Sequence, residues 1–189
     1  MSLGRKLRFA ANPAEVFVVA RAAAVLAAIP PLLKFVDIEK IVRTLTPARP
    51  RAGAAALPRE RVTYLCHRTF GFAGRMSYRP NCLRRALVQY HCLRLHGVPA
   101  VLQFGVKRNE GALAGHCWLT VDGTLYDERA DMVSQFTQMF ALPAPERNST
   151  DAGTPRAGAP GANPPGVGPS GANPSGVGPR DVRRLSFGG

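Results

Sequence analysis

Residues 80–97 of the chain read PNCLRRALVQYHCLRLHG, and residues 112–128 read ALAGHCWLTVDGTLYDE. The first segment has the apolar spacing of a helix, whereas the second alternates around a turn, as a pair of strands does. In chain order the two segments supply Cys82, then His116, then Asp127. A thiol, an imidazole and a carboxylate in this order are a candidate nucleophile, base and orienting group.

The sequence around Cys82 predicts that this residue begins a helix. Pro80 cannot continue a helix from upstream, Asn81 is a favoured N-cap, and the apolar repeat runs on until Gly97. At a helix start, unpaired backbone N–H groups and the positive end of the dipole favour a thiolate, which is the nucleophilic form of cysteine. The alternative for Cys82 taken alone is an ordinary buried cysteine.

The segment after Gly97 predicts strands. Residues 100–106 are mostly apolar, residues 107–111 have the composition of a turn, and residues 114–121 alternate before Asp122-Gly123, a strong hairpin signal. A two-residue loop at Asp122-Gly123 would set Val121 opposite Thr124. Alternation then places one set of side chains on a common face: His116, Trp118, Thr120, Leu125 and Asp127.

Within this hairpin His116 and Asp127 would be diagonal neighbours, close enough for a carboxylate to reach an imidazole. Asp127 would then hold the tautomer of His116 and stabilise its charged form. The alternative is a core histidine and a carboxylate at a turn. The shared face, together with a cysteine at a helix start, favours the catalytic interpretation.

These residues resemble the leader-peptidase component of lasso peptide biosynthesis, a family of transglutaminase-like cysteine proteases. The family has a Cys-Leu-x-Arg-Ser-Leu helix, a Phe-Gly-Val strand and an Ala-His-Ala-Trp-Val-Glu strand. The matching segments here are NCLRRAL at 81–87, LHGVPAVLQFGV at 95–106 and AGHCWLTVDG at 114–123. This chain differs in having Ala86 in place of the family's serine, and Gly115 and Cys117 beside the histidine.

The resemblance implies that Cys82 is the nucleophile, His116 the base and Asp127 the orienting group of a cysteine peptidase. It also implies a substrate, the leader of a ribosomally synthesised precursor peptide, and partners: a separate leader-recognition protein and an ATP-dependent lasso cyclase. No cofactor is expected. Two alternatives stay open. The same three residues could catalyse acyl transfer to an amine, as in transglutaminases, or the chain could be a non-catalytic peptide-binding maturation protein.

The expected fold class is α+β, with a papain-like or transglutaminase-like core. Residues 1–57 are predicted as an N-terminal helical region, residues 58–142 as the peptidase core, and residues 143–189 as a disordered tail with a tandem ten-residue repeat at 161–180. Arg183 to Phe187 are either a docking peptide or a plain disordered end.

Further helices are expected outside the central segment. The first begins at Asn12 with Pro13 and a capping-box Glu15 and is broken by Pro30-Pro31. The next two are expected over 32–44 and 58–69. A last helical stripe of apolar residues is expected to close the core: Met132, Val133, Phe136, Met139 and Phe140.

The formal net charge of +13 is spread along the chain, and no nucleic-acid motif is present. The excess is either a set of solvated arginines or a basic cleft for an acidic partner. The apolar run at 22–33 is short and contains two prolines, so neither a membrane span nor a signal peptide is expected, and a cytoplasmic location is predicted. A zinc site using Cys92 and His96 is the weaker alternative to reduced, metal-free thiols.

Overall fold

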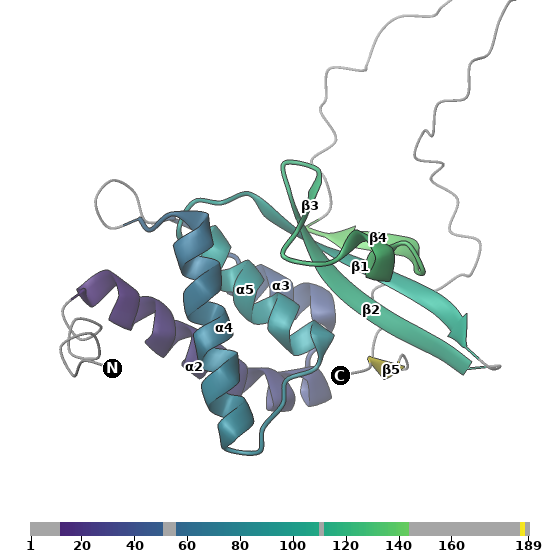
Figure 1. Cartoon of the computed structure of the whole chain (residues 1–189), viewed down its shortest axis with the longest axis horizontal. Coiled ribbons are helices and arrows are strands. Elements are labelled where there is room, and N and C mark those ends of the chain that lie inside the picture. The colour runs from purple at the N-terminus through teal and green to yellow at the C-terminus, as the bar shows by residue number, and fades with distance from the viewer. Residues whose placement is uncertain (1–11, 51–55, 110–111, 144–185, 188–189) are drawn as a thin grey trace, which may run out of the picture.

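The computed structural model describes residues 12–50, 56–109, 112–143 and 186–187. Four longer helices form one half of the described structure, and an antiparallel sheet forms the other (Figure 1). The helices and the helix-facing side of the sheet share one hydrophobic core. The predicted α+β class is confirmed.

The first helix, α2, spans Pro13–Phe35 and runs through Pro30-Pro31, so the predicted break there is wrong. Each proline removes a backbone donor and crowds the preceding turn, which ordinarily ends a helix. Here the adjoining turn is anchored by Ile29, which is fully buried. The chain leaves helical geometry at Val36, and α3 then spans Ile38–Leu45.

The start of α2 is only partly as expected. Asn12 caps the helix, because its side chain accepts a hydrogen bond from the Ala14 N–H at 3.0 Å. Glu15 does not complete a capping box. Its buried carboxylate instead accepts two hydrogen bonds from Arg61, at 2.8 and 2.9 Å, and so joins α2 to α4, Arg59–Arg75.

By length and composition, α2 is the one helix in the described part of the chain that is apolar enough to cross a membrane. The core helix of a soluble protein and a signal sequence pass the same test. In this structure α2 packs against α4 and α5 and buries Val18, Ala22 and Ile29 completely. The predicted cytoplasmic location stays a prediction.

The next two helices position the site. α4 is longer than the expected 58–69 and ends at Arg75. α5, Cys82–Leu95, starts at the predicted residue and is the central helix, because α2, α3 and α4 pack on it and it also packs against β1 and β2. Its buried face includes Leu87, Tyr90 and Leu93, each with no exposed surface.

The sheet has the order β3-β2-β1-β4. β1, Ala100–Asn109, pairs with β2, Ala112–Val121, and both strands extend beyond their predicted ends at the hairpin. β2 also pairs with β3, Thr124–Tyr126. Val121 lies opposite Thr124 as predicted, and Asp122 and Gly123 have φ of 50° and 75°, the left-handed values of a type I′ turn.

The predicted helical stripe from Met132 to Phe140 is wrong for most of its length. Only α6, Ala130–Val133, is helical, and β4 follows over Thr137–Leu142. β4 pairs with β1, and the Phe140 ring stacks on Phe104 at 4.6 Å. An available strand edge on β1 therefore outweighed the local helical spacing.

The predicted disordered tail lies mostly outside the described residues. Its described part is Pro143 and Ser186–Phe187. Ser186–Phe187 forms β5 and pairs in parallel with β2 at Ala114 and Gly115. The predicted domain boundaries at 57 and 142 stay predictions. The helices on both sides of residue 57 contribute to the same hydrophobic core.

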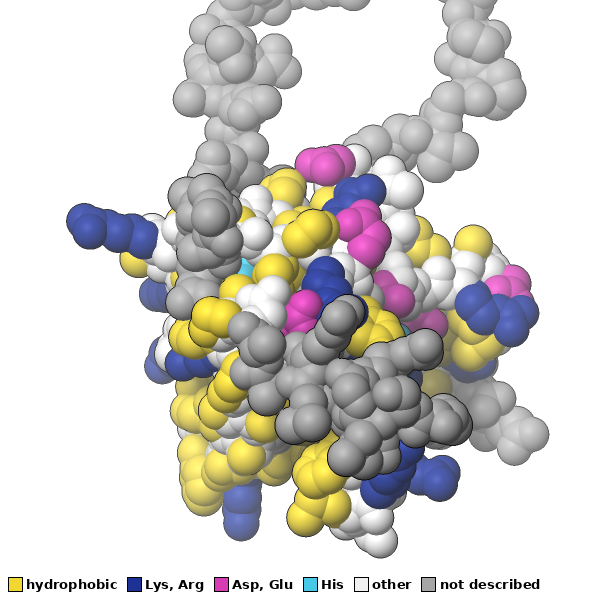
Figure 2. Space-filling view, turned by 60° about the vertical axis from the view of Figure 1, so that its left-hand side comes forward, with side chains coloured by type: hydrophobic (Ala, Val, Ile, Leu, Met, Phe, Trp, Pro, Cys, Tyr) yellow, Lys and Arg dark blue, Asp and Glu magenta, His cyan; other side chains and the backbone are white. Residues whose placement is uncertain are grey.

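The basic side chains do not gather in one place on the face shown in Figure 2. Lys and Arg are spread around its rim and centre, with hydrophobic side chains between them. This distribution agrees with solvated arginines better than with a single basic cleft on this face.

Candidate active site

Cys82 lies where the start of α5 meets the open edge of β2. Asn81 caps the helix by accepting a hydrogen bond from the Arg84 N–H at 3.1 Å, so Cys82 is the first helical residue as predicted. β3 pairs with β2 only from Leu119 onward, which leaves the backbone N–H of Cys117 unpaired by that strand. This N–H and that of Leu83 lie close enough to the Cys82 sulfur to lower the pKa of its thiol.

Burial and hydrogen bonding act on the Cys82 thiol in opposite directions. Burial raises the pKa of Cys82, and the backbone N–H groups of Cys117 and Leu83 lower it only in part, so the pKa lies above its ordinary value. The charge of Glu128 adds a smaller upward contribution. The sulfur is therefore a neutral thiol at neutral pH and needs a base to become a nucleophile.

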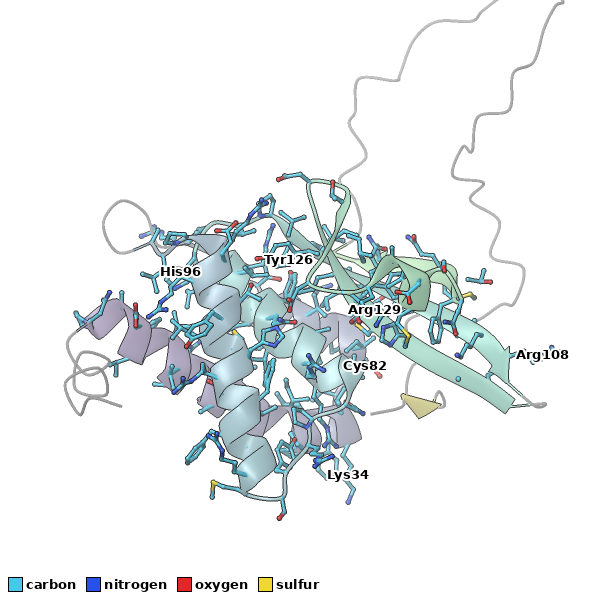
Figure 3. The ribbon with its side chains drawn as sticks, in the orientation of Figure 1. Lys34, Cys82, His96, Arg108, Tyr126 and Arg129 are labelled. Carbon is cyan, nitrogen blue, oxygen red and sulfur yellow. The ribbon has the colours of Figure 1, made fainter. Side chains whose placement is uncertain are left out.

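A cavity of about 420 Å³ opens beside this thiol. It is lined by Cys82 and Gln89 from α5 and by residues from both faces of β2, including Cys117 on the core side and His116 on the other. In Figure 3, Cys82 and Tyr126 lie at the junction of the helices and the sheet, whereas Arg108 lies at the far end of the β1–β2 hairpin. The three predicted residues, Cys82, His116 and Asp127, all line this cavity.

His116 lies in an aromatic stack on the face of β2 that points away from the helices. Its ring stacks on Trp118 at 5.9 Å and on Phe136 at 4.9 Å, and the Lys107 ammonium lies 4.9 Å from the centre of the Phe136 ring. Trp118 in turn covers Gly105, where an added Cβ would come within 2.7 Å of the indole. The two ring contacts hold the plane of the imidazole.

Burial lowers the pKa of His116, Glu128 raises it, and Lys107 lowers it further, with a net fall below the ordinary value. His116 is therefore neutral at neutral pH and able to accept a proton. Its Nε2 atom is buried and has no hydrogen-bond partner among the described residues. No hydrogen bond joins it to Cys82 in this part of the chain; without substrate, catalytic hydrogen bonds are often long.

The predicted contact between Asp127 and His116 is not formed. β3 ends at Tyr126, and Asp127 has φ of 55°, a left-handed conformation that ends the alternation of side chains. Its Oδ2 atom lies 2.6 Å from His67 Nε2 and accepts a short hydrogen bond from the Gln89 amide. We call His67, Gln89 and Asp127 the helix-side cluster.

The helix-side cluster stabilises the ionised form of Asp127. Burial alone would raise the pKa of this carboxyl, but the hydrogen bonds from His67 and Gln89, with the nearby charges of His67 and Arg85, hold it below its usual range. The neighbouring Tyr126 hydroxyl is 2.9 Å from the Thr63 hydroxyl on α4. The end of β3 is thus tied to α4 and α5 through side chains that all have partners.

The same turn brings a different carboxylate to His116. Glu128 Oε2 lies 3.7 Å from His116 Nε2, on the sheet side of Asp127. We call His116, Glu128, Phe136 and Lys107 the sheet-side cluster. Sequence reasoning missed Glu128, Phe136 and Lys107. The adjacent acidic pair at 127–128 was the available signal, because a shift of one residue exchanges the two carboxylates between faces.

The other thiols are buried. Burial raises the pKa of Cys117 well above its ordinary value, and the hydrogen bond with Cys92, together with burial, does the same for Cys66. Within the described residues, no group of three or more His, Cys, Asp and Glu side chains is arranged to hold a metal ion. Among the cysteines, Cys82 is the one that is partly exposed.

The sequence profile of the transglutaminase-like superfamily matches residues 23–141. The match covers more than half of the chain and includes Cys82, His116 and both carboxylates of the turn. No curated protein and no solved structure is significantly similar to the chain.

Proposed function

Because the chain belongs to the transglutaminase-like superfamily, whose members are usually catalytic cysteine enzymes and include peptidases and acyltransferases, we propose that it is a cysteine peptidase. Its substrate is the leader of a ribosomally synthesised precursor peptide, in lasso peptide maturation. The observation that carries the proposal is the position of Cys82, at a helix N-terminus and in one cavity with His116.

The reaction starts from the neutral Cys82 thiol and the neutral His116 imidazole. The Cys82 sulfur attacks the scissile carbonyl carbon while His116 takes the thiol proton, which gives a tetrahedral oxyanion. We propose the backbone N–H groups of Cys117 and Leu83, which lower the pKa of the Cys82 thiol in the free enzyme, as donors to that oxyanion. As the C–N bond breaks, His116 gives its proton to the leaving amine and a thioester remains.

Hydrolysis completes the cycle. A water molecule attacks the thioester, His116 takes one of its protons and returns a proton to the sulfur, and the acid product leaves. If an amine replaces water in this step, the same residues carry out acyl transfer. The mass of the product separates the two outcomes.

The sheet-side cluster stabilises the charged form of His116 that arises during these steps. Glu128 is the carboxylate that faces His116 Nε2, so we assign to Glu128 the orienting role that was predicted for Asp127. With Nε2 directed toward Glu128, the Nδ1 atom of His116 is the one left for the thiol proton. Asp127 is then a positioning residue, which holds the turn in place from the helix side.

The remaining partners stay proposals. We propose that a separate leader-recognition protein presents the precursor and that an ATP-dependent lasso cyclase uses the product, as the resemblance implies. If the recognition protein acts by tethering, it raises the local concentration of the precursor and accelerates cleavage well below saturation. Equal rates with and without it would contradict this part of the proposal.

The test is to trap the acyl-enzyme. The purified protein is incubated with a precursor peptide encoded near its gene, and intact-protein and peptide masses are recorded. We expect a thioester adduct on Cys82 and a leader product carrying a free acid. Cys82→Ala should abolish both, whereas Cys66→Ala, which changes a buried thiol outside the cavity, should abolish neither. A precursor cleaved at the same rate by Cys82→Ala would refute the mechanism.

A further inference from the structure

One edge of β2 carries two partners with the proposed nucleophile between them. β3 pairs with this edge at 119–121, and β5 pairs with β2 at Ala114 and Gly115. The Cys117 N–H, halfway between them, lies near the Cys82 sulfur and lowers the pKa of its thiol. Figure 1 shows β5 beside β2, below the junction of the sheet and the helices.

Backbone alternation identifies the groups that β5 uses. Leu119 and Val121 pair with β3, and the Cys117 N–H points to Cys82, so the odd-numbered residues of this part of β2 face the open edge. The N–H and C=O groups of Gly115 therefore point toward β5. Ala114 and Gly115 are small, which lets a second backbone approach closely.

Such an edge can bind any extended peptide through its main chain, because strand addition needs only backbone donors and acceptors. The edge ends one residue before His116, so a peptide paired here would run directly past the cavity that holds Cys82. The occupant in this structure is a segment of the chain itself, Ser186–Phe187.

We propose that the β2 edge at Ala114–Gly115 is a peptide-docking edge and that the C-terminal segment around Ser186–Phe187 is its intramolecular occupant, which a substrate peptide must displace. The consequence for turnover rests on the proposed peptidase function, whereas the docking itself does not. The Pro- and Gly-rich residues 144–185 connect the core to this segment.

The occupant is expected to bind weakly and to act through tethering. A two-residue strand forms few hydrogen bonds, but attachment to the same chain gives an effective concentration of about 1 mM. If the free segment binds with a Kd of about 1 mM, the tethered segment fills the edge about half of the time and raises the KM of a competing peptide about twofold. The kcat should not change, because a saturating substrate displaces the segment.

The test uses the full chain with Ser186→Pro and Phe187→Pro together, which removes both backbone donors of β5. The matched control is Gly176→Pro with Val177→Pro, two prolines placed in the tandem repeat and away from β5. The probe is a fluorescein-labelled peptide with the sequence of residues 181–189, followed by fluorescence anisotropy. Hydrogen exchange of the Gly115 amide, which points toward β5, reports on occupancy of the edge.

We expect the β5 variant to bind the labelled peptide about twofold more tightly than the wild type and the control, and its Gly115 amide to lose protection until the peptide is added. Equal binding by all three proteins, or unchanged protection of the Gly115 amide in the β5 variant, would overturn the proposal. Neither readout needs turnover, so failure of the peptidase function would leave this result unaffected. In an active enzyme, a lower KM at constant kcat for the β5 variant is the additional expected result.

Discussion

On each side of the turn at 127–128 a histidine lies beside a carboxylate. The two pairs differ in the distance between the partners and in the exposure of the histidine. On the helix side, His67 and Asp127 lie 2.6 Å apart, and His67 is 41% exposed. On the sheet side, His116 and Glu128 are 3.7 Å apart, and His116 is 14% exposed with a buried Nε2 that lacks a hydrogen-bond partner among the described residues. A satisfied pair stabilises a fold, whereas a buried group left without a partner calls for an explanation such as catalysis.

Replacing the two histidines should give the largest difference in activity between the sheet-side and helix-side clusters. His116→Ala should lower kcat/KM by at least about 10³-fold, because the base is lost, while the protein stays folded. His67→Ala should leave activity within about threefold of wild type and lower thermal stability, because only a structural hydrogen bond is lost. Loss of activity in a folded His67→Ala protein would reverse the assignment of the clusters.

The next test compares the two carboxylates. Glu128→Gln should reduce kcat/KM by about 10- to 100-fold, since the imidazolium loses its counter-charge. It should also move the acid limb of the pH–rate profile to lower pH, because Glu128 raises the pKa of His116. A purely structural role for Glu128 would not move this limb.

Asp127→Asn should act mainly on stability, with a loss of about 1–2 kcal/mol from weakened hydrogen bonds to a charged group. The pKa of Asp127 is depressed in the folded protein, so its contribution is present above the ordinary carboxyl pKa and is lost as the pH falls through the folded value. Denaturant unfolding at neutral and acidic pH checks this. If Asp127→Asn instead reduces kcat more than Glu128→Gln does, the orienting role belongs to Asp127.

The sequence predicted correctly those features that depend on a few neighbouring residues. Asn81 as a cap located the start of α5, and Asp122-Gly123 gave the hairpin register. These features depend on a few neighbouring backbone groups, which sequence shows directly.

The parts that sequence did not predict depend on distant partners. The helix continues through Pro30-Pro31 next to the fully buried Ile29, and β4 forms because β1 offers an edge. Asp127 has φ of 55°, a value that aspartate allows but does not require. As a result Glu128, and not Asp127, lies beside His116. The sequence predicted three residues that line one cavity, Cys82, His116 and Asp127, but it did not predict which carboxylate lies beside which histidine.

A smaller effect is expected from the packing of Trp118 on Gly105, next to the sheet-side cluster. Gly105→Ala should destabilise the protein by about 1–3 kcal/mol, because its Cβ would meet the Trp118 ring at 2.7 Å and the Thr137 carbonyl at 3.0 Å. Gly74→Ala in α4 is the matched control: nothing lies within 4 Å of its Cβ, and alanine favours a helix. Thermal melting of both variants measures the difference. Equal melting temperatures would mean that Trp118 does not pack tightly over Gly105.

The smallest effect concerns Lys107, whose charge acts on His116 from the rim of the cavity. Its ammonium donates a hydrogen bond to Gln135 at 3.0 Å and lies over the Phe136 ring, and it lowers the pKa of His116. Lys107→Met keeps most of the side-chain stem but removes the charge, so the pKa of His116 should rise and the acid limb of kcat/KM should move to higher pH. This shift is opposite to the one expected for Glu128→Gln.

Lys107→Arg keeps the positive charge and should leave the acid limb where it is in the wild type, which makes it the matched control. The measurement is kcat/KM across the acid range for all three proteins. If Lys107→Met and Glu128→Gln moved the limb in the same direction, the titrating group would not be an imidazole placed between these two charges. The base would then have to be sought outside the sheet-side cluster, and His67, the other histidine near the turn, would be the first candidate.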